Sequence, residues 1–238
     1  MKKAVSIATA FLVSIFNCAQ TFNVHKTNGE VIRISLTELD YVDFSEDKTL
    51  AGPPASVEAI DLGFPSGTKW ANMNVGATKP EEYGGYYAWG ETEEKGIYSE
   101  ETWHDDEGLR MTNYPSSYRG IAYSNFDVAH IRWGNTWHLP TYDQLRELID
   151  NCNALWTTLN GVYGYELTSK LNGKKLFLPA AGHKIFNGLK NEGKECSYLQ
   201  SANSGWGNSE SGSYIYPFLA IHSTGNAYYG RTVRAVME

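Results

Sequence analysis

One segment, residues 137–149, constrains the fold more than any other part of the chain. It starts with Trp-His-Leu-Pro-Thr, which predicts a short strand that ends at Pro140, since proline cannot donate to a strand ladder. Thr141 then predicts a helix N-cap, and Gln144 completes a capping box three residues later. Apolar residues follow at helical spacing, which predicts one buried helix face formed by Leu145, Leu148, Ile149 and Cys152.

Composition favours many turns and short strands over long helices. The 238 residues include 23 Gly, 16 Tyr and 7 Trp, while only 20% are charged. The net charge of −7 argues against a nucleic-acid partner, which would require a basic face.

The start of the chain predicts export. Two lysines at positions 2 and 3 precede an apolar run at 4–16 that is too short to span a bilayer comfortably, so residues 1–19 are interpreted as a signal peptide. Cleavage after Ala19 is the favoured processing. The alternative is a surface lipoprotein lipidated at Cys18, in which the membrane is contacted only through that anchor. Either way we expect a secreted or outer-surface protein.

Three further units follow the signal. Residues 20–47 predict a β-hairpin leader, because two alternating stretches flank Asn28-Gly29, a type I′ turn pair. Residues 48–56 are a short, proline-containing linker. Residues 57–238 form the main domain. Its expected strands are 58–62, 69–75, 155–159, 162–168, 175–178, 196–201, 214–222 and 229–236, with a short helix at 127–133 and turns at Asn160-Gly161 and Asn172-Gly173.

Several main-domain motifs resemble a known family when taken together. They are the Leu-Pro-Thr helix start at 139–141, Leu-Pro-Ala-Ala-Gly at 178–182, Thr-Val-Arg-Ala-Val at 232–236, and the block from 61 to 70 with Trp-Gly-Glu at 89–91. This combination resembles the Fibrobacter succinogenes major paralogous domain, over about 180 residues. The resemblance implies an α+β, C-type-lectin-like fold with short twisted antiparallel strands and one or two helices. It also implies a secreted or surface protein of Bacteroides-type bacteria.

The late chain predicts a binding surface rich in aromatic, Asn and Ser side chains. Tyr and Trp offer rigid contact area, while Asn and Ser supply adaptable hydrogen bonds. An alternative is that Tyr214 and Tyr216 alternate because one strand face is core. The candidate ligand-binding residues are Trp206, Asn208, Tyr214, Tyr216, His222, Asn226, Tyr228 and Tyr229.

No metal or other cofactor is predicted. The Glu-Pro-Asn, Gln-Pro-Asp and Trp-Asn-Asp tripeptides of calcium-dependent lectins are missing, and the acidic run from Glu91 to Glu107 is interpreted as a solvated loop. His130 and His138, beside Trp133 and Trp137, are expected to pack or cap.

Catalysis is not predicted either. The helix start at 139–141 is also similar to sulfatase-modifying enzymes that form formylglycine, but their reactive cysteine pair has no counterpart here. Cys152 and Cys196 are instead interpreted as two separate buried thiols, with a disulfide between them as the alternative that export permits.

The sequence therefore predicts a non-enzymatic recognition module that binds a glycan or a surface protein. The alternative is a structural or assembly module that adds a strand to another chain through its hairpin or late strands.

Overall fold

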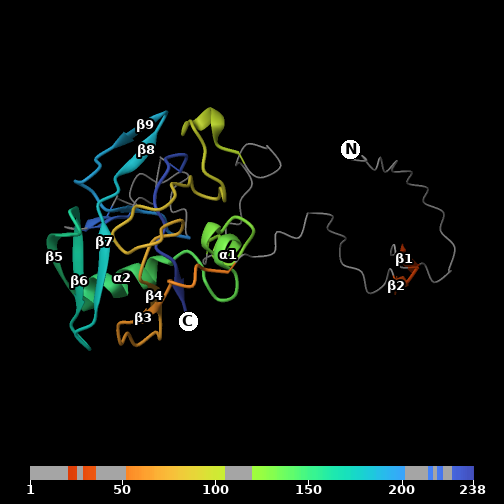
Figure 1. Ribbon diagram of the computed structural model, residues 1–238, viewed down its shortest axis with the longest axis horizontal. Coiled ribbons are helices and arrows are strands. Elements are labelled where there is room, and N and C mark those ends of the chain that lie inside the picture. Colours follow the sequence, from red (N-terminus) through yellow and green to blue (C-terminus); the bar gives the residue numbers. More distant parts are fainter. Residues whose placement is uncertain are drawn as a thin grey trace. The chain divides into compact units, whose positions relative to one another are not determined.

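The computed structural model describes residues 21–25, 29–35, 52–104, 120–201, 214–216, 219–221 and 227–238 (Figure 1). The chain divides into two compact units, Met1–Lys48 and Thr49–Glu238. Among the described residues, no helix combines the length and apolar character needed to cross a bilayer.

The first unit holds an antiparallel pair of strands, as predicted. Strand β1 (Thr21–His25) pairs with β2 (Val31–Ser35), and His25 lies opposite Val31. This register leaves residues 26–30 between the strands. Residues 26–28, and with them Asn28 of the predicted type I′ turn, lie outside the described residues.

The second unit is α+β. Its described residues form small, mostly antiparallel sheets, two α-helices and a single 3-10 turn. The sheets are β13-β4-β3, β5-β6-β7, β8-β9 and β10-β12-β11, and β10 with β12 is the parallel pair. The bounds are β3 Ala59–Asp61, β4 Lys69–Ala71, η1 Glu100–Thr102, α1 Val128–Trp133, α2 Tyr142–Asn151, β5 Cys152–Leu159, β6 Val162–Ser169, β7 Lys175–Pro179, β8 His183–Ile185, β9 Gly188–Lys190, β10 Ser197–Tyr198, β11 Tyr214–Tyr216, β12 Leu219–Ile221 and β13 Val236–Met237.

Helix α2 confirms the helix predicted to follow Pro140, whereas the short strand expected before Pro140 is only an isolated bridge of His138 with Val236. Thr141 is its N-cap, and the capping box with Gln144 is complete. The predicted apolar face is buried, with Leu145, Leu148 and Ile149 in the core and Cys152 just beyond the helix. Helix α1 likewise confirms the short helix expected at 127–133, with Asp127 as its N-cap.

The hairpin of β5 and β6 also matches its prediction. Asn160 and Gly161 both have positive φ, 49° and 86°, as a type I′ turn requires. Eight residue pairs follow, from Leu159 with Val162 to Cys152 with Ser169.

The late chain differs from its prediction. The expected strand at 214–222 is two short strands, β11 and β12, which pair antiparallel with Tyr216 opposite Leu219. The expected strand at 229–236 is reduced to β13 and isolated bridges such as Tyr198 with Thr232. Pro217 lies between the two strands, and because proline cannot donate to a strand ladder it was a local signal against one continuous strand.

Two apolar clusters form the core of the second unit. One is built mainly from aromatic residues around α1, including Trp89, Trp103, Trp133 and Trp137. The other lies between α2 and the β5-β6-β7 sheet and includes Leu148, Leu167 and Leu178. Trp70 and Val236 belong to the same cluster.

A buried arginine holds the last strand in place. Arg234 donates from Nε to Asn74 Oδ1 at 2.8 Å, from Nη1 to Ala71 O at 3.0 Å and from Nη2 to Phe177 O at 2.9 Å. Burial lowers the pKa of Arg234, yet a guanidinium stays charged in proteins. Three fixed acceptors therefore replace its water shell and connect three distant segments.

Loss of the α2 cap and loss of its core contacts should differ in size. Thr141→Ala should lower the free energy of unfolding by about 1 kcal/mol through the missing cap. Leu148→Ala should lower it by roughly 2–5 kcal/mol through a cavity in a tight core. Chemical denaturation measures both, and equal, negligible effects would mean that α2 does not stabilise the fold as described.

Arg234→Met should destabilise the protein strongly, because three buried acceptors lose their donors at roughly 1–3 kcal/mol each. Arg146→Met is the matched control, since Arg146 lies 3.6 Å from Asp150 at the surface of α2, where ion pairs contribute little. Urea titrations of both variants provide the comparison. A similar midpoint for the two variants would argue against the role given to Arg234.

Candidate functional site

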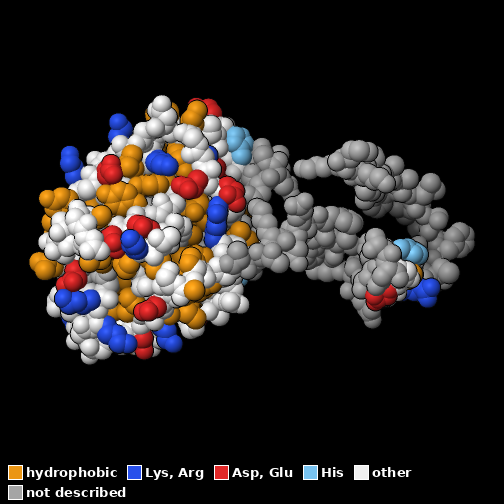
Figure 2. Space-filling model, viewed as in Figure 1, with side chains coloured by type: hydrophobic (Ala, Val, Ile, Leu, Met, Phe, Trp, Pro, Cys, Tyr) orange, Lys and Arg blue, Asp and Glu red, His pale blue; other side chains and the backbone are white. Residues whose placement is uncertain are grey.

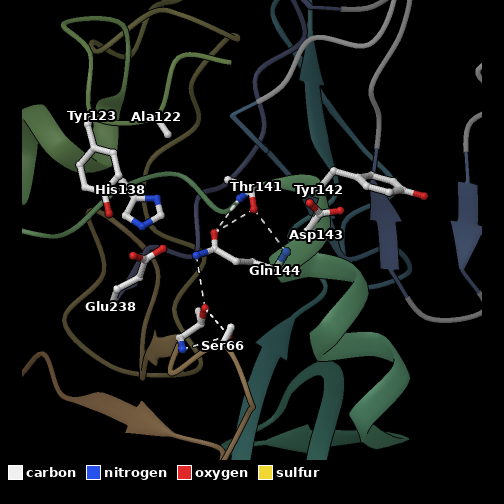
Figure 3. Close-up of a pocket in the computed structure, with 10 residues that line it drawn as sticks. Ser66, Ala122, Tyr123, His138, Thr141, Tyr142, Asp143, Gln144 and Glu238 are labelled. Carbon is white, nitrogen blue, oxygen red and sulfur yellow. Dashed lines mark hydrogen bonds between the residues drawn. The ribbon is translucent and has the colours of Figure 1, made fainter. Parts of the chain in front are cut away.

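A pocket of about 560 Å³ opens beside the start of α2 (Figure 3). Four parts of the chain meet there: the turn before β4, the loop before α1, the segment that leads into α2 with its first turn, and the residue after β13. The lining residues are Ser66, Thr68, Ala122, Tyr123, His138, Thr141, Tyr142, Asp143, Gln144 and Glu238.

The capping box forms one wall of the pocket. Gln144 N donates to Thr141 Oγ1 at 3.3 Å, and Thr141 N donates to Gln144 Oε1 at 2.9 Å. Gln144 Nε2 then donates to Thr68 Oγ1 at 3.3 Å, so the cap is tied to the turn that holds Ser66 (Figure 3). Ser66 Oγ lies 2.8 Å from Thr68 Oγ1 and also hydrogen bonds to Glu147. The same side chains that start the helix thus fix this wall.

His138 is a buried, neutral side chain with an unused acceptor. It is 1% exposed, and its Nδ1 lies 2.8 Å from Leu139 O. A carbonyl only accepts, so Nδ1 carries the hydrogen and Nε2 is the acceptor. Burial lowers the pKa of His138 below its ordinary value of 6.5, although the Leu139 hydrogen bond and the Asp127 and Glu238 carboxyl groups oppose this. Nε2 has no hydrogen-bond partner in the structure.

Tyr123 covers the His138 ring. Their ring centroids are 4.2 Å apart with planes inclined by 37°, and Figure 3 shows Tyr123 on one side of the imidazole and Glu238 on another. Tyr123 is 40% exposed, so its side chain separates His138 from solvent.

The Asp127 carboxylate positions both Tyr123 and the 137–139 segment. Its Oδ1 accepts from Ala129 N, His130 N and Leu139 N at 3.0–3.1 Å, and its Oδ2 accepts from Tyr123 N at 3.0 Å. These bonds hold Tyr123 at a φ of 65°, an uncommon value for a tyrosine. Burial raises the pKa of Asp127, and the backbone donors oppose that shift.

The pocket offers many acceptors and lacks fixed cations. The described lining residues include the carboxyl groups of Asp143 and Glu238, five hydroxyls and the unpaired His138 nitrogen, but neither lysine nor arginine. Such a lining suits a ligand that donates hydrogen bonds, such as a polyol or an amine, and disfavours phosphate or carboxylate.

The predicted late-chain residues lie elsewhere or outside the described residues. Tyr228 and Tyr229 are half-buried and touch each other edge to face, with centroids 5.1 Å apart. Tyr229 also stacks on His183 at 5.3 Å, and neither tyrosine lines the pocket. Tyr214 and Tyr216 belong to β11. Outside the described residues are Trp206, Asn208, His222 and Asn226, as well as Cys18.

The two remaining cysteines are separate buried thiols, so the structure shows no disulfide between Cys152 and Cys196. Burial raises the pKa of Cys152 to about 11 and that of Cys196 to about 12. Cys196 Sγ donates to Leu178 O at 3.2 Å.

The described part of the chain contains no group of three His, Cys, Asp or Glu side chains arranged to hold a metal ion. Glu91, at the start of the acidic run, is instead paired with Lys95 Nζ at 2.7 Å and accepts from His104 N at 3.0 Å. The end of that run, residues 105–107, lies outside the described residues.

His138 and His130 were predicted to pack or cap, and both rings pack against Tyr123. The sequence did not predict that His138 also lines a pocket with Tyr123 and Glu238. The available signal was a histidine within the apolar run that precedes a helix cap, a position where a polar ring requires a partner. The contributions of Ser66 and Glu238 had no local signal.

Comparison of the chain with models of protein families, with curated proteins and with solved structures finds no match.

Because the pKa of His138 is lowered in the folded protein, a fall in pH should destabilise the fold. As pH falls below about 6.5 the unfolded chain takes up a proton at this position before the folded protein does, so stability present above that pH is lost. His138→Asn should lessen this loss between about pH 7 and pH 5, while its amide still donates to Leu139 O. Denaturant unfolding across this pH range tests the effect, and identical pH profiles for the two proteins would contradict it.

Proposed function

We propose that this chain is an exported, non-enzymatic recognition module whose pocket beside α2 binds a glycan through its hydroxyl groups. The observation that carries the proposal is the buried His138 Nε2, an acceptor without a partner in a side chain that lines the pocket. Leaving such a group unpaired costs roughly 1–3 kcal/mol. A ligand hydroxyl that reaches it recovers this energy.

A neutral hydroxylated ligand fits the lining best. Sugar hydroxyls both donate and accept, which matches Thr68, Thr141 and the carboxyl group of Asp143, while a tyrosine ring offers an apolar face to the sugar ring. Tyr123 is the movable wall in this proposal, since its half-exposed side chain must shift for a ligand to reach His138.

The proposed fold is C-type-lectin-like, and the proposed family is the major paralogous domain. In support, the family-like motifs meet in space: Arg234 donates to Phe177 O, beside the motif at 178–182. Val236 and His138 exchange two backbone hydrogen bonds of 3.0 Å. The signal-like start of the chain supports the proposed location at the cell surface.

An enzyme related to the sulfatase-modifying proteins is the less favoured alternative. That chemistry requires a reactive thiolate, and burial raises the pKa of both described thiols far above neutral.

The binding proposal is tested by screening the purified protein on a glycan array and titrating the best soluble glycan by calorimetry. His138→Asn should weaken binding at least tenfold, because the shorter side chain cannot place an acceptor at the Nε2 position. Asp143→Asn and Glu238→Gln distinguish the two classes of ligand. Both variants should still bind a neutral glycan, but they should bind an amine more weakly.

Trp206→Ala is the competing variant, because the late chain was the surface predicted from sequence. If the late chain binds the ligand, this change should cost about 2 kcal/mol or more, as truncation of a hot-spot aromatic does. That result, combined with unchanged affinity in His138→Asn, would refute the pocket and favour the late-chain surface.

A further inference from the structure

Strand β5 is a long, exposed edge strand. It is an outer strand of the β5-β6-β7 sheet, and among the described residues it pairs along its full length with β6 alone. Residues 153–156 are all exposed, and both side-chain faces of the strand therefore reach solvent there. Figure 1 shows β5 at the margin of the second unit, beyond β6 and β7.

The hydrogen bonds of β6 show which groups β5 turns outward. Tyr163 O accepts from Ala180 N and Ser169 N donates to Lys174 O, so the odd-numbered residues of β6 face β7. Its even-numbered residues therefore bond to β5, where they pair with 153, 155, 157 and 159. The backbone groups of Ala154, Trp156 and Thr158 are left pointing away from the sheet.

The usual devices that block an exposed edge are missing from β5. Its sequence, Cys-Asn-Ala-Leu-Trp-Thr-Thr-Leu, has no charged residue and no proline. The register with β6 is continuous over eight pairs, so there is no bulge to twist the edge away. Soluble proteins normally protect long edges by one of these means, and an unprotected edge pairs with another chain.

Apolar side chains border the edge on both faces. Leu155 is 61% exposed on one face. On the other, Trp156 is 38% exposed and contacts Tyr165 edge to face at 4.8 Å, with Tyr163 stacked at 6.2 Å from it. Figure 2 shows hydrophobic side chains at the surface on the side of the molecule where β5 and β6 lie.

We propose that two copies of this chain associate by antiparallel pairing of β5 with β5 about a two-fold axis at Leu155. This register makes Ala154 a hydrogen-bonded partner of Trp156 in the second copy, and symmetry repeats the pair. Each such pair exchanges two backbone hydrogen bonds. The large Trp156 side chain then lies opposite the small Ala154, and the two exposed Leu155 side chains meet on the other face.

Charge favours a second copy as the occupant. Because β5 is uncharged throughout, antiparallel pairing with itself brings no like charges together. A basic or acidic partner strand would find no counter-charge along this edge. The β5 edge shares no residue with the pocket, so a result that refutes one proposal does not refute the other.

Cysteine cross-linking tests the register directly. Leu155 would face its own copy as a non-hydrogen-bonded pair, whose Cβ atoms approach closely enough for a disulfide. The full-length Leu155→Cys protein should therefore form at least tenfold more disulfide-linked dimer than Leu189→Cys, a matched variant at an exposed leucine on β9. Equal cross-linking of the two variants would refute the register.

Sedimentation equilibrium tests the association itself. The unmodified protein should dimerise as its concentration rises. Ala154→Pro removes an outward N–H but no bond to β6, so it should weaken dimerisation at least tenfold, whereas Ala154→Ser should not. Leu155→Lys should also weaken it, and Leu189→Lys should not. A protein that stays monomeric at all concentrations, or an undiminished Ala154→Pro dimer, would overturn the proposal, and the edge would then be open to a strand of another protein.

Discussion

The buried guanidinium of Arg234 is the constraint on which the second unit depends. A charged group can leave water only if fixed acceptors replace its hydration, and Asn74, Ala71 and Phe177 supply three of them. These acceptors come from the end of β4, the turn that follows it and β7. The last segment of the chain is thereby held in one position. From that position Val236 pairs with both Trp70 and His138, and Glu238 reaches the pocket. The proposed site is therefore a consequence of how the arginine is accommodated.

Local features of the fold could be predicted where short-range chemistry decides the outcome. The α2 cap depends on Thr141 and Gln144, three residues apart, and the β5–β6 turn depends on Asn160 and Gly161. Both are recognisable in the sequence. The late strands were predicted less well. Pro217 was a local signal against one continuous strand at 214–222, whereas the short β13 depends on pairing with β4, far away in the sequence.

The pocket was even less accessible to sequence reasoning. Its residues come from four parts of the chain, and hydrogen bonds between them cross large sequence separations, such as the bond of Gln144 with Thr68. The significance of His138 depends on its tautomer, which is fixed by Leu139 O, and on Tyr123, which is held in place by Asp127. The binding surface was instead predicted in the late chain, because that part of the sequence is rich in aromatic, Asn and Ser residues. Composition indicates which residues can bind a ligand, but it does not indicate where a cavity forms.

The proposed pocket and the proposed β5 interface depend on different kinds of interaction. The pocket depends on a few directional hydrogen bonds in a partly dry site, which provide selectivity for donor groups. The edge depends on backbone pairing and apolar area. A dimer formed through β5 would carry two pockets, so a surface that displays repeated glycans would be bound with avidity.

In the proposed site His138 presents an unpaired acceptor to a ligand, and ¹⁵N NMR of the imidazole side chain measures this directly. In the free protein at neutral pH, the spectrum should show a neutral ring protonated at Nδ1, with an Nε2 shift typical of a nitrogen without a hydrogen bond. Adding the glycan selected on the array should move the Nε2 resonance upfield while Nδ1 stays protonated. A ring protonated at Nε2, or an Nε2 resonance unchanged at saturating glycan, would contradict the claim.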